Sequence, residues 1–193
     1  KNGTFYGIDQ HGALIFAIET SDDIMASPSI LSIGDGPPII FFGNDDGEIY
    51  AILPDGSILD GWPITLSEDI ISSIVFSDLN SDLIPEIIFP LDDGSLYVLD
   101  INGNDYDNTP FQYAFPYTSS PTIIDLDLDG DLEIFCGSGD GLNVFDIKEE
   151  GINEGYWNIF RGNLNRDGYF RHIVMGDVNY DSNSDIFDII LIV

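Results

Sequence analysis

The sequence has very few positively charged residues. Its 193 residues contain 5 Lys and Arg against 35 Asp and Glu, which gives a formal net charge of −30 at pH 7. Proteins bind phosphate backbones mainly through Lys and Arg, so this balance argues against nucleic acid as a partner. We expect part of the acidic charge to bind cations and part to keep the surface solvated.

Cysteine, histidine and long apolar runs are also scarce. The single cysteine, Cys136, excludes a disulfide within the chain, and we expect it to be a small core residue. The two histidines, His11 and His172, lie far apart in the sequence, and we expect both at the surface without a catalytic role. No apolar run reaches the length of a membrane span. A hydrophobic content of 44% is nevertheless enough for a packed core.

One acidic stretch has the spacing of a calcium-binding loop. It begins at Asp125 and reads Asp-Leu-Asp-Leu-Asp-Gly-Asp-Leu-Glu. Side-chain oxygens at alternate positions, a glycine at a sharp bend and a closing carboxylate are typical of such loops. A second copy begins 47 residues earlier, at Asp78. The candidate metal ligands are Asp125, Asp127, Asp129, Asp131 and Glu133 in one loop, and Asp78, Asn80, Asp82 and Glu86 in the other.

The segments that follow each loop repeat with the same period. An apolar strand is expected first, then an Asp-Gly or Asn-Gly turn, then a second strand, because these dipeptides between apolar runs are strong hairpin signals. The first strands are expected at 39–43, 86–90 and 133–137. The second strands are expected at 4–8, 48–52, 95–99 and 142–145. A further turn is expected after each second strand, at 10–12, 54–56, 102–103 and, in looser form, at 148–151.

One unit therefore reads as four short strands in about 45 residues, the size of a propeller blade. We predict an all-β fold, a partial β-propeller of about three to four blades of four antiparallel strands. Strands that are apolar on both faces, such as 39–42, fit sheets that stack face to face. An ordinary β-sandwich with chance similarity is the alternative. The predicted blades are 1–26 (partial), 27–71, 72–118 and 119–171.

Two other stretches only approximate the metal loop. Residues 32–39 are one residue short, with Ser32 and Ile39 where Asp125 and Glu133 stand in the intact copy, so we expect no calcium there. The segment 163–168 has alternating oxygen-bearing residues but no closing carboxylate. A turn beside an aromatic cap is the favoured interpretation of that segment.

Residues 172–193 are predicted to form a separate module, an EF-hand-like loop followed by a helix. Counted as a 12-residue loop, 177–188 has oxygen-bearing residues at positions 1, 3, 5, 9 and 12. Ser182 and Ser184 depart from the usual glycine and apolar residue. Residues 186–193 read as the exiting helix, with a C-terminal strand as the alternative. The candidate ligands are Asp177, Asn179, Asp181, Asn183 (through its backbone carbonyl), Asp185 and Asp188.

With these residues in view, the repeats resemble the FG-GAP/VCBS family, whose calcium-loop blades also occur in integrin α-subunit propellers. The matching segments are Ser-Ser-Pro and the acidic loop within 119–134, Asp-Gly-Ser-Leu-Tyr at 93–97 and Gly-Trp-Pro at 61–63. Residues 157–170 are similar to the closing motif of propellers in secreted bacterial proteins, and 176–193 resemble the first half of a type I dockerin. The resemblance implies Ca²⁺ as the metal and an extracellular or cell-surface location. It also implies a cohesin-like partner for the tail and a longer parent protein with further blades.

Two functions fit the sequence. The first is a non-catalytic binding or adhesion module with a protein or glycan ligand on a propeller face. The second is the propeller part of a polysaccharide-active enzyme, similar to rhamnogalacturonan lyases, whose catalytic residues lie outside this chain. No Gly-x-Ser-x-Gly, zinc-ligand or phosphate-loop motif occurs in the sequence. The acid pairs lie in the metal loops, where a cation would hold them ionised, whereas a general acid needs a raised pKa. The first function is therefore favoured.

Overall fold

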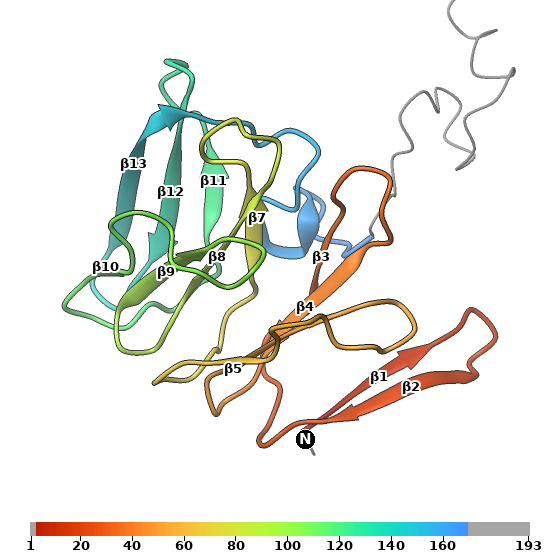
Figure 1. The fold of residues 1–193 in the computed structure, drawn as a ribbon. Helices are drawn as coiled ribbons and strands as arrows, with labels where there is room; N and C mark the ends of the chain where they lie inside the picture. The colour runs from red at the N-terminus through yellow and green to blue at the C-terminus, as the bar shows by residue number, and fades with distance from the viewer. Residues whose placement is uncertain (1–2, 170–193) are drawn as a thin grey trace, which may run out of the picture.

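The computed structural model describes residues 3–169, which form four antiparallel β-sheets and no α-helix (Figure 1). The predicted dockerin-like tail lies outside the described residues. Among residues 3–169, no helix is long and apolar enough to cross a membrane. The strands of the first two sheets are β1 (Thr4–Ile8), β2 (Leu14–Glu19), β3 (Ser29–Leu31), β4 (Ile39–Gly43), β5 (Glu48–Ile52) and β6 (Ile64–Thr65). Those of the other two are β7 (Val75–Ser77), β8 (Glu86–Pro90), β9 (Ser95–Leu99), β10 (Phe111–Gln112), β11 (Thr122–Ile124), β12 (Asp131–Gly137) and β13 (Leu142–Glu150).

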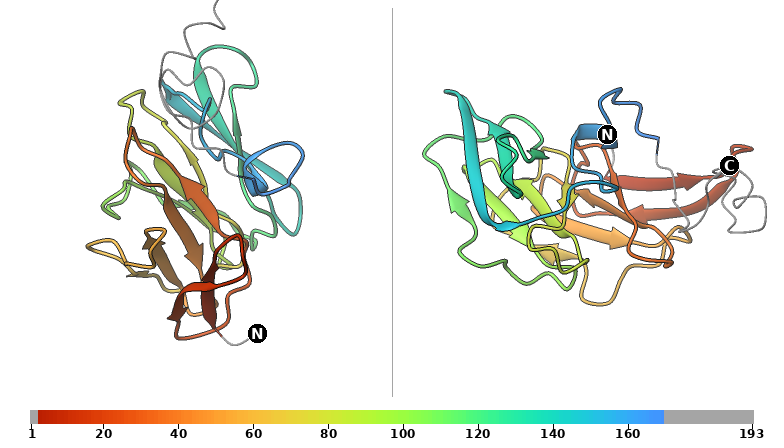
Figure 2. Two further views of the ribbon diagram at one scale, coloured as in Figure 1. Left: turned by 90° about the vertical axis from the view of Figure 1, so that its right-hand side faces the viewer. Right: turned by 90° about the horizontal axis from the view of Figure 1, so that it is seen from above.

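Each sheet is formed by consecutive strands of one stretch of the chain. The orders are β1-β2, β3-β4-β5-β6, β7-β8-β9-β10 and β11-β12-β13. The sheets follow one another side by side in chain order, as the views in Figure 2 show. The prediction of an all-β, propeller-like fold is confirmed, and the β-sandwich alternative, which needs two packed sheets, is wrong.

The repeated turns place the strands where the sequence predicted them. Gly47 lies in the turn between β4 and β5, and Gly94 lies in the turn between β8 and β9. Both have positive φ, 75° and 86°, which glycine adopts without steric cost. The Leu66 N–H donates to the Gly47 carbonyl and the Tyr113 N–H donates to the Gly94 carbonyl, both at close range (2.9 and 2.8 Å). Leu66 directly follows β6 and Tyr113 directly follows β10. The two turns therefore also anchor the chain where it leaves the outermost strand of each of these two sheets.

One predicted turn is wrong. Residues 148–151 were expected to form a looser second turn, but β13 continues as a strand to Glu150. Lys148, Glu149 and Glu150 are not turn-forming residues, and Gly151, the one glycine of the four, does not adopt positive φ. Instead Leu132 pairs with Ile147 and Asp131 with Glu150, with a register shift between them. Within residues 3–169 the last sheet accordingly has three strands, and its outermost strand is long.

The second four-stranded sheet is buried on both faces. Strand β8 has five buried residues, and neighbouring side chains enter different cores. Ile87 and Phe89 pack in a cluster with Phe41 of β4, while Ile88 packs in a cluster with Ile134 of β12. The expectation that strands apolar on both faces stack between neighbouring sheets is confirmed.

The chain after β13 returns along the inner strands and joins the last two sheets. The Phe76 N–H donates to the Trp157 carbonyl (2.9 Å), and the Ile123 N–H donates to the Asn158 carbonyl (3.0 Å). Trp157 is itself buried in the core cluster that contains Phe41. This segment therefore satisfies backbone groups of β7 and β11 that no strand on their inner side pairs with.

The Asp-Gly turns can be tested with one pair of glycine substitutions. A Cβ at Gly94 (φ 86°) would lie 2.6 Å from the Tyr113 carbonyl oxygen, whereas at Gly12 (φ 83°) it would meet nothing within 4 Å. We expect Gly12→Ala to cost about 1 kcal/mol of unfolding free energy through backbone strain alone. Gly94→Ala should cost at least about 2 kcal/mol, because strain and overlap add. Urea denaturation measures both, and equal losses would contradict the packed-turn geometry.

Candidate metal centre

Four carboxylates gather in the loop between β11 and β12. They are Asp127, Asp129, Asp131 and Glu133, and one ligand atom from each lies within 4.8 Å of the others. Asp127 and Asp129 are exposed, Asp131 is half-buried and Glu133 is buried. Carboxylate oxygens are hard donors, of the type that binds Mg²⁺, Ca²⁺ and Mn²⁺. The cluster could therefore hold a metal ion.

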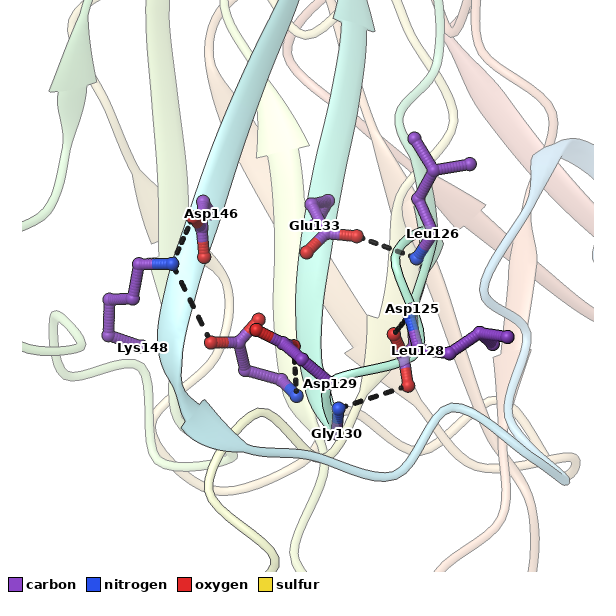
Figure 3. Close-up of polar contacts among 9 residues, drawn as sticks. Asp125, Leu126, Leu128, Asp129, Gly130, Glu133, Asp146 and Lys148 are labelled. Carbon is purple, nitrogen blue, oxygen red and sulfur yellow. Dashed lines mark hydrogen bonds and ion pairs between the residues drawn. The ribbon is translucent and has the colours of Figure 1, made fainter.

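Asp125, the first predicted ligand, does not belong to this cluster. Its two carboxylate oxygens accept hydrogen bonds from the Leu128 N–H (2.7 Å) and the Gly130 N–H (3.2 Å), as Figure 3 shows. Both donors belong to residues with positive φ, 65° at Leu128 and 100° at Gly130. Asp125 thus stabilises the bend that turns the later side chains of the loop toward one another.

Glu133 closes the loop from the start of β12, of which it is the third residue. One of its carboxylate oxygens accepts a hydrogen bond from the Leu126 N–H at 2.7 Å. The residue is only 7% exposed. A buried carboxylate needs hydrogen-bond donors or a cation, and this one has a single protein donor among the described residues.

The negative charges of the cluster repel one another. Partial burial raises the pKa of Asp131 to about 6, and the neighbouring Asp129 carboxylate adds to that rise. The pKa of Asp129 is lowered instead, chiefly because the Asp131 backbone N–H donates to it. One oxygen of Asp131, Oδ1, is buried and has no hydrogen-bond partner within residues 3–169. A bound cation would supply the missing partner and relieve the repulsion.

A lysine lies beside the cluster, and the sequence analysis missed it. The Lys148 ammonium is 3.8 Å from Asp131 Oδ2 and is also paired with Asp146 (Figure 3). It reaches this position because β13 continues past residue 147 and runs antiparallel to β12. The only sequence signal was the alternation of Asp146 and Lys148 on one side of a strand that was expected to end earlier.

The loop 78–86 repeats the backbone of the loop 125–133. The Leu79 N–H donates to Glu86 at 2.7 Å, as the Leu126 N–H does to Glu133. The Leu83 N–H donates to Asp78 at 2.8 Å, which corresponds to the Gly130–Asp125 bond. Ser81 and Leu83 have positive φ, 59° and 69°, at the positions equivalent to Leu128 and Gly130. Two copies of the motif therefore fold the same way.

The side chains of this second loop are used differently. Asp78 is fully buried, and its oxygens accept backbone N–H groups of its own loop. The Asn80 and Asp82 side chains likewise accept hydrogen bonds from the Asp82 and Ile84 N–H groups. Asp78, Asp82 and Glu86 do not form a close carboxylate group of the kind found at 127–133 among the residues described. Metal binding at Asp78, Asn80, Asp82 and Glu86 stays a prediction.

The other candidate loops have different outcomes. Residues 32–39 form a short turn whose acidic residue, Asp35, is exposed. In the segment 163–168 the Asn163 amide donates to Asp167 at 2.7 Å and the Tyr169 N–H donates to the same oxygen at 2.9 Å, which is a hydrogen-bonded turn. The predicted ligands of 177–188 lie outside the described residues.

Comparison with known proteins supports the fold. No protein-family model matches the chain, and no curated protein matches it. Solved structures do match. BamB from Moraxella catarrhalis matches at 18% identity and a TM-score of 0.53, over 77% of this chain and 41% of that one. A structure of BBS1N in complex with ARL6DN matches at 9% identity and a TM-score of 0.52, over 82% and 50% of the two chains. A protein of unknown function from Bacteroides caccae matches at 14% identity and a TM-score of 0.50, over 79% and 53%.

These structures are similar to the chain in fold alone. The class is a propeller-like repeat of small antiparallel sheets, in agreement with the sheets seen in residues 3–169. The chain spans about half the length of the structures it matches.

The buried glutamate of the second loop predicts a pH dependence. Burial, together with the charges of Asp82 and Asp78, raises the pKa of Glu86 from 4.5 to about 7. The folded state then binds more protons than the unfolded state between these values, so stability should fall as pH rises from about 4.5 to 7. In calcium-free protein, Glu86→Gln should flatten that part of the curve. Denaturation at several pH values in EDTA measures it, and an unchanged slope would contradict the shift.

Lys148 predicts a competition with the cation. Its ammonium partly neutralises Asp131, so Lys148→Ala should strengthen divalent-cation binding, by no more than about fivefold because the pair is exposed to solvent. Arg166→Ala is the matched control, since this exposed residue lies outside the loop. Isothermal titration gives both affinities. Weaker binding in Lys148→Ala would show that the ammonium supports the site.

Proposed function

We propose that the chain is a calcium-binding propeller module that binds a protein or a glycan and has no catalytic role. The observation that carries the proposal is the carboxylate group Asp127, Asp129, Asp131 and Glu133 on a loop whose backbone is repeated at 78–86. A loop that recurs with its sheet serves the architecture. Its role is to hold two strands of a blade together, and the ligand is bound elsewhere.

Several features support calcium as the ion. Ca²⁺–oxygen distances of about 2.4 Å place opposite ligands roughly 5 Å apart, and the four ligand atoms lie within 4.8 Å of one another. Ca²⁺ also accepts irregular sets of six to eight oxygens, whereas Mg²⁺ demands an octahedron. Asp131 Oδ1, which has no hydrogen-bond partner within residues 3–169, can offer its lone pairs to the ion.

The binding role is supported by the surface near the first hairpin. A cavity of about 530 Å³ lies between the β1–β2 hairpin and the inner strands of the next sheet. Phe5, Phe16 and Ile40 contribute to its mostly apolar lining. Tyr6 and Ile8 also line it, and they are 50% and 60% exposed. Exposed apolar surface next to a cavity is typical of protein-binding sites, and one of the similar propeller structures, BBS1N, was solved in complex with a protein.

An extracellular or cell-surface location and an anchoring role for residues 172–193 complete the proposal. They rest on the resemblance of the loops to FG-GAP/VCBS repeats and of the tail to a dockerin, with a cohesin-like protein as the partner of the tail. Simple carboxylate loops are filled with calcium where the ion is abundant, and that is outside the cell.

Calcium should raise the melting temperature by mass action on the native state. At a concentration a hundredfold above Kd, one site stabilises by about 2.7 kcal/mol, which corresponds to a rise of roughly 5–10 °C for a chain of this size. Differential scanning calorimetry in excess calcium, in magnesium and in EDTA measures the shift. Identical curves in calcium and EDTA would overturn the metal assignment.

Two variants locate the effect. Asp129→Asn combined with Asp131→Asn should lose the part of the calcium shift that belongs to the loop 125–133. Asp35→Asn changes one exposed acid in the degenerate loop and should keep the whole shift. An equal loss in both variants would mean that calcium acts only by screening the overall negative charge.

A further inference from the structure

The first sheet has a strand edge that no other strand of residues 3–169 covers. By their place in the repeat, β1 and β2 correspond to β5 and β6, the last two strands of a four-stranded sheet. Strand β5 pairs with β4 on one side and with β6 on the other, whereas β1 pairs with β2 alone among the described strands. The hairpin stands at the end of the row of sheets (Figure 1). The open edge of β1 is therefore a template for an added antiparallel strand.

The core beneath this edge is incomplete within residues 3–169. In the second and third sheets, the strand next to the equivalent of β1 sends Phe41 or Ile88 into the core shared with the following sheet. The first sheet has no such strand among the described residues, and Phe5 and Phe16 of the hairpin stay only partly buried. The cavity of about 530 Å³ lies there, between β1 and Ile40 of β4. It marks the volume that a further strand would fill.

Residues 173–190, which lie outside the described residues, have the sequence of the missing strand pair. The segment 177–186 aligns without a gap with 78–87 and 125–134: oxygen-bearing residues stand at the same alternate positions, a carboxylate closes the loop and Ile follows it directly. The preceding Ile-Val at 173–174 corresponds to Ile-Val at 74–75. The copy begins five residues later than the period of 47 would place it. Its closing carboxylate is Asp185, whereas the 12-residue EF-hand count closes at Asp188.

The two residues after this Ile fit the two faces of such a strand. Phe187 takes the position of Phe41 and Ile88, whose side chains point toward the following sheet. Asp188 takes the position of Phe89, whose side chain points toward the preceding sheet. Successive side chains of a strand point to opposite faces. On the first sheet, which has no preceding sheet among residues 3–169, Phe187 would enter the cavity and Asp188 would face water.

The described chain ends beside the open edge. Asp167 and Gly168 line the same cavity as Phe5 and Gly7 of β1. Residues 169–173 are five residues, which span up to roughly 16–18 Å when extended. The first strand of an added pair would lie two strand spacings, about 10 Å, from β1. The segment can therefore reach this edge from its own chain.

We propose that residues 173–176 and 186–190 dock on the open edge of β1 as a strand pair and complete a four-stranded sheet with β1 and β2. The registers of β4 on β5 and of β8 on β9 place Ile186 opposite Ile8 and Phe187 opposite Gly7. The acidic loop 177–185 then joins two strands of one sheet, as the loops 78–86 and 125–133 do.

Docking of the tail goes beyond the proposed function and constrains it. A docked tail occupies the cavity beside the first hairpin, so it competes with an external ligand of that cavity. It is also withdrawn from a cohesin-like partner, so docking and anchoring are alternative roles of the same segment. Calcium binding at the loop 125–133 belongs to another sheet and does not depend on either role.

Paired cysteines test the docked register. Ile8→Cys with Ile186→Cys places two thiols at directly opposite positions, where Cα atoms are about 4.5–5.5 Å apart and a disulfide can form. In the control, Ile8→Cys with Ile190→Cys, the second thiol lies four residues, roughly 13 Å, further along the same strand. Oxidation of the dilute full chain and mass spectrometry of its peptides measure the products. We expect an intrachain disulfide in the first variant only. Cys136 is buried and common to both.

Phe187→Ala and Asp188→Ala form a second, matched pair. Phe187→Ala should lower the melting temperature of the full chain by roughly 5 °C or more, because it empties part of a core. It should also speed hydrogen exchange of β1 amides, which a packed neighbouring strand protects. Asp188→Ala should change neither quantity, and it should leave calcium binding to the tail intact.

Three results would overturn the proposal. The first is an equal yield of disulfide in the two cysteine pairs, or none in either. The second is a disulfide between two chains, which would assign the edge of β1 to a second copy. The third is loss of calcium binding to the tail in Asp188→Ala without any change in β1, which would make the tail a separate EF-hand-like module. The calcium shift that depends on Asp129 and Asp131 is measured independently, so failure of that proposal is distinguishable from failure of this one.

Discussion

The fold depends on the burial of both faces of each inner strand. In β8 the side chains of Ile87 and Phe89 enter one core and that of Ile88 enters the other, and all three are fully buried. A single sheet of this kind would expose one apolar face to water, at a cost of about 25 cal/mol for each Å². Each sheet is therefore stable only between neighbours, and the sequence must repeat its pattern to supply them.

The same constraint determines where the functional groups lie. An inner strand such as β7 has three residues, so its two ends are only about 7–10 Å apart. Residues 71–73 precede the strand and the acidic loop follows it, with Ser73 at one end and Asp78 at the other. A cation bound by the loop would therefore also stiffen this short strand.

Much of the fold could be predicted from the sequence because turn chemistry and repetition agree. The bounds of β1, β4, β5, β8 and β9 match the expected segments, each next to a turn with Gly at a position of positive φ. Prediction failed at 148–151, where β13 continues to Glu150 and Gly151 does not adopt positive φ, and this error concealed Lys148, which lies beside Asp131. The sequence also did not show that Asp125 accepts backbone N–H groups of its own loop, and metal binding by Asp125 stays a prediction.

The two acidic loops share one backbone conformation, but their carboxylates differ in burial and in charge repulsion. The loop 78–86 is covered by the chain that follows β13: Ser81 donates to the Glu150 carbonyl at 2.8 Å, and Asp78 exchanges two backbone hydrogen bonds with Ile152. Glu86 is buried in this loop, and burial raises its pKa to about 7. In the loop 125–133, Asp127 and Asp129 stay exposed and meet other carboxylates. A cation can approach the exposed carboxylates of the loop 125–133 through water, whereas in the loop 78–86 both Asp78 and Glu86 are buried. We therefore expect the loop 125–133 to bind calcium first.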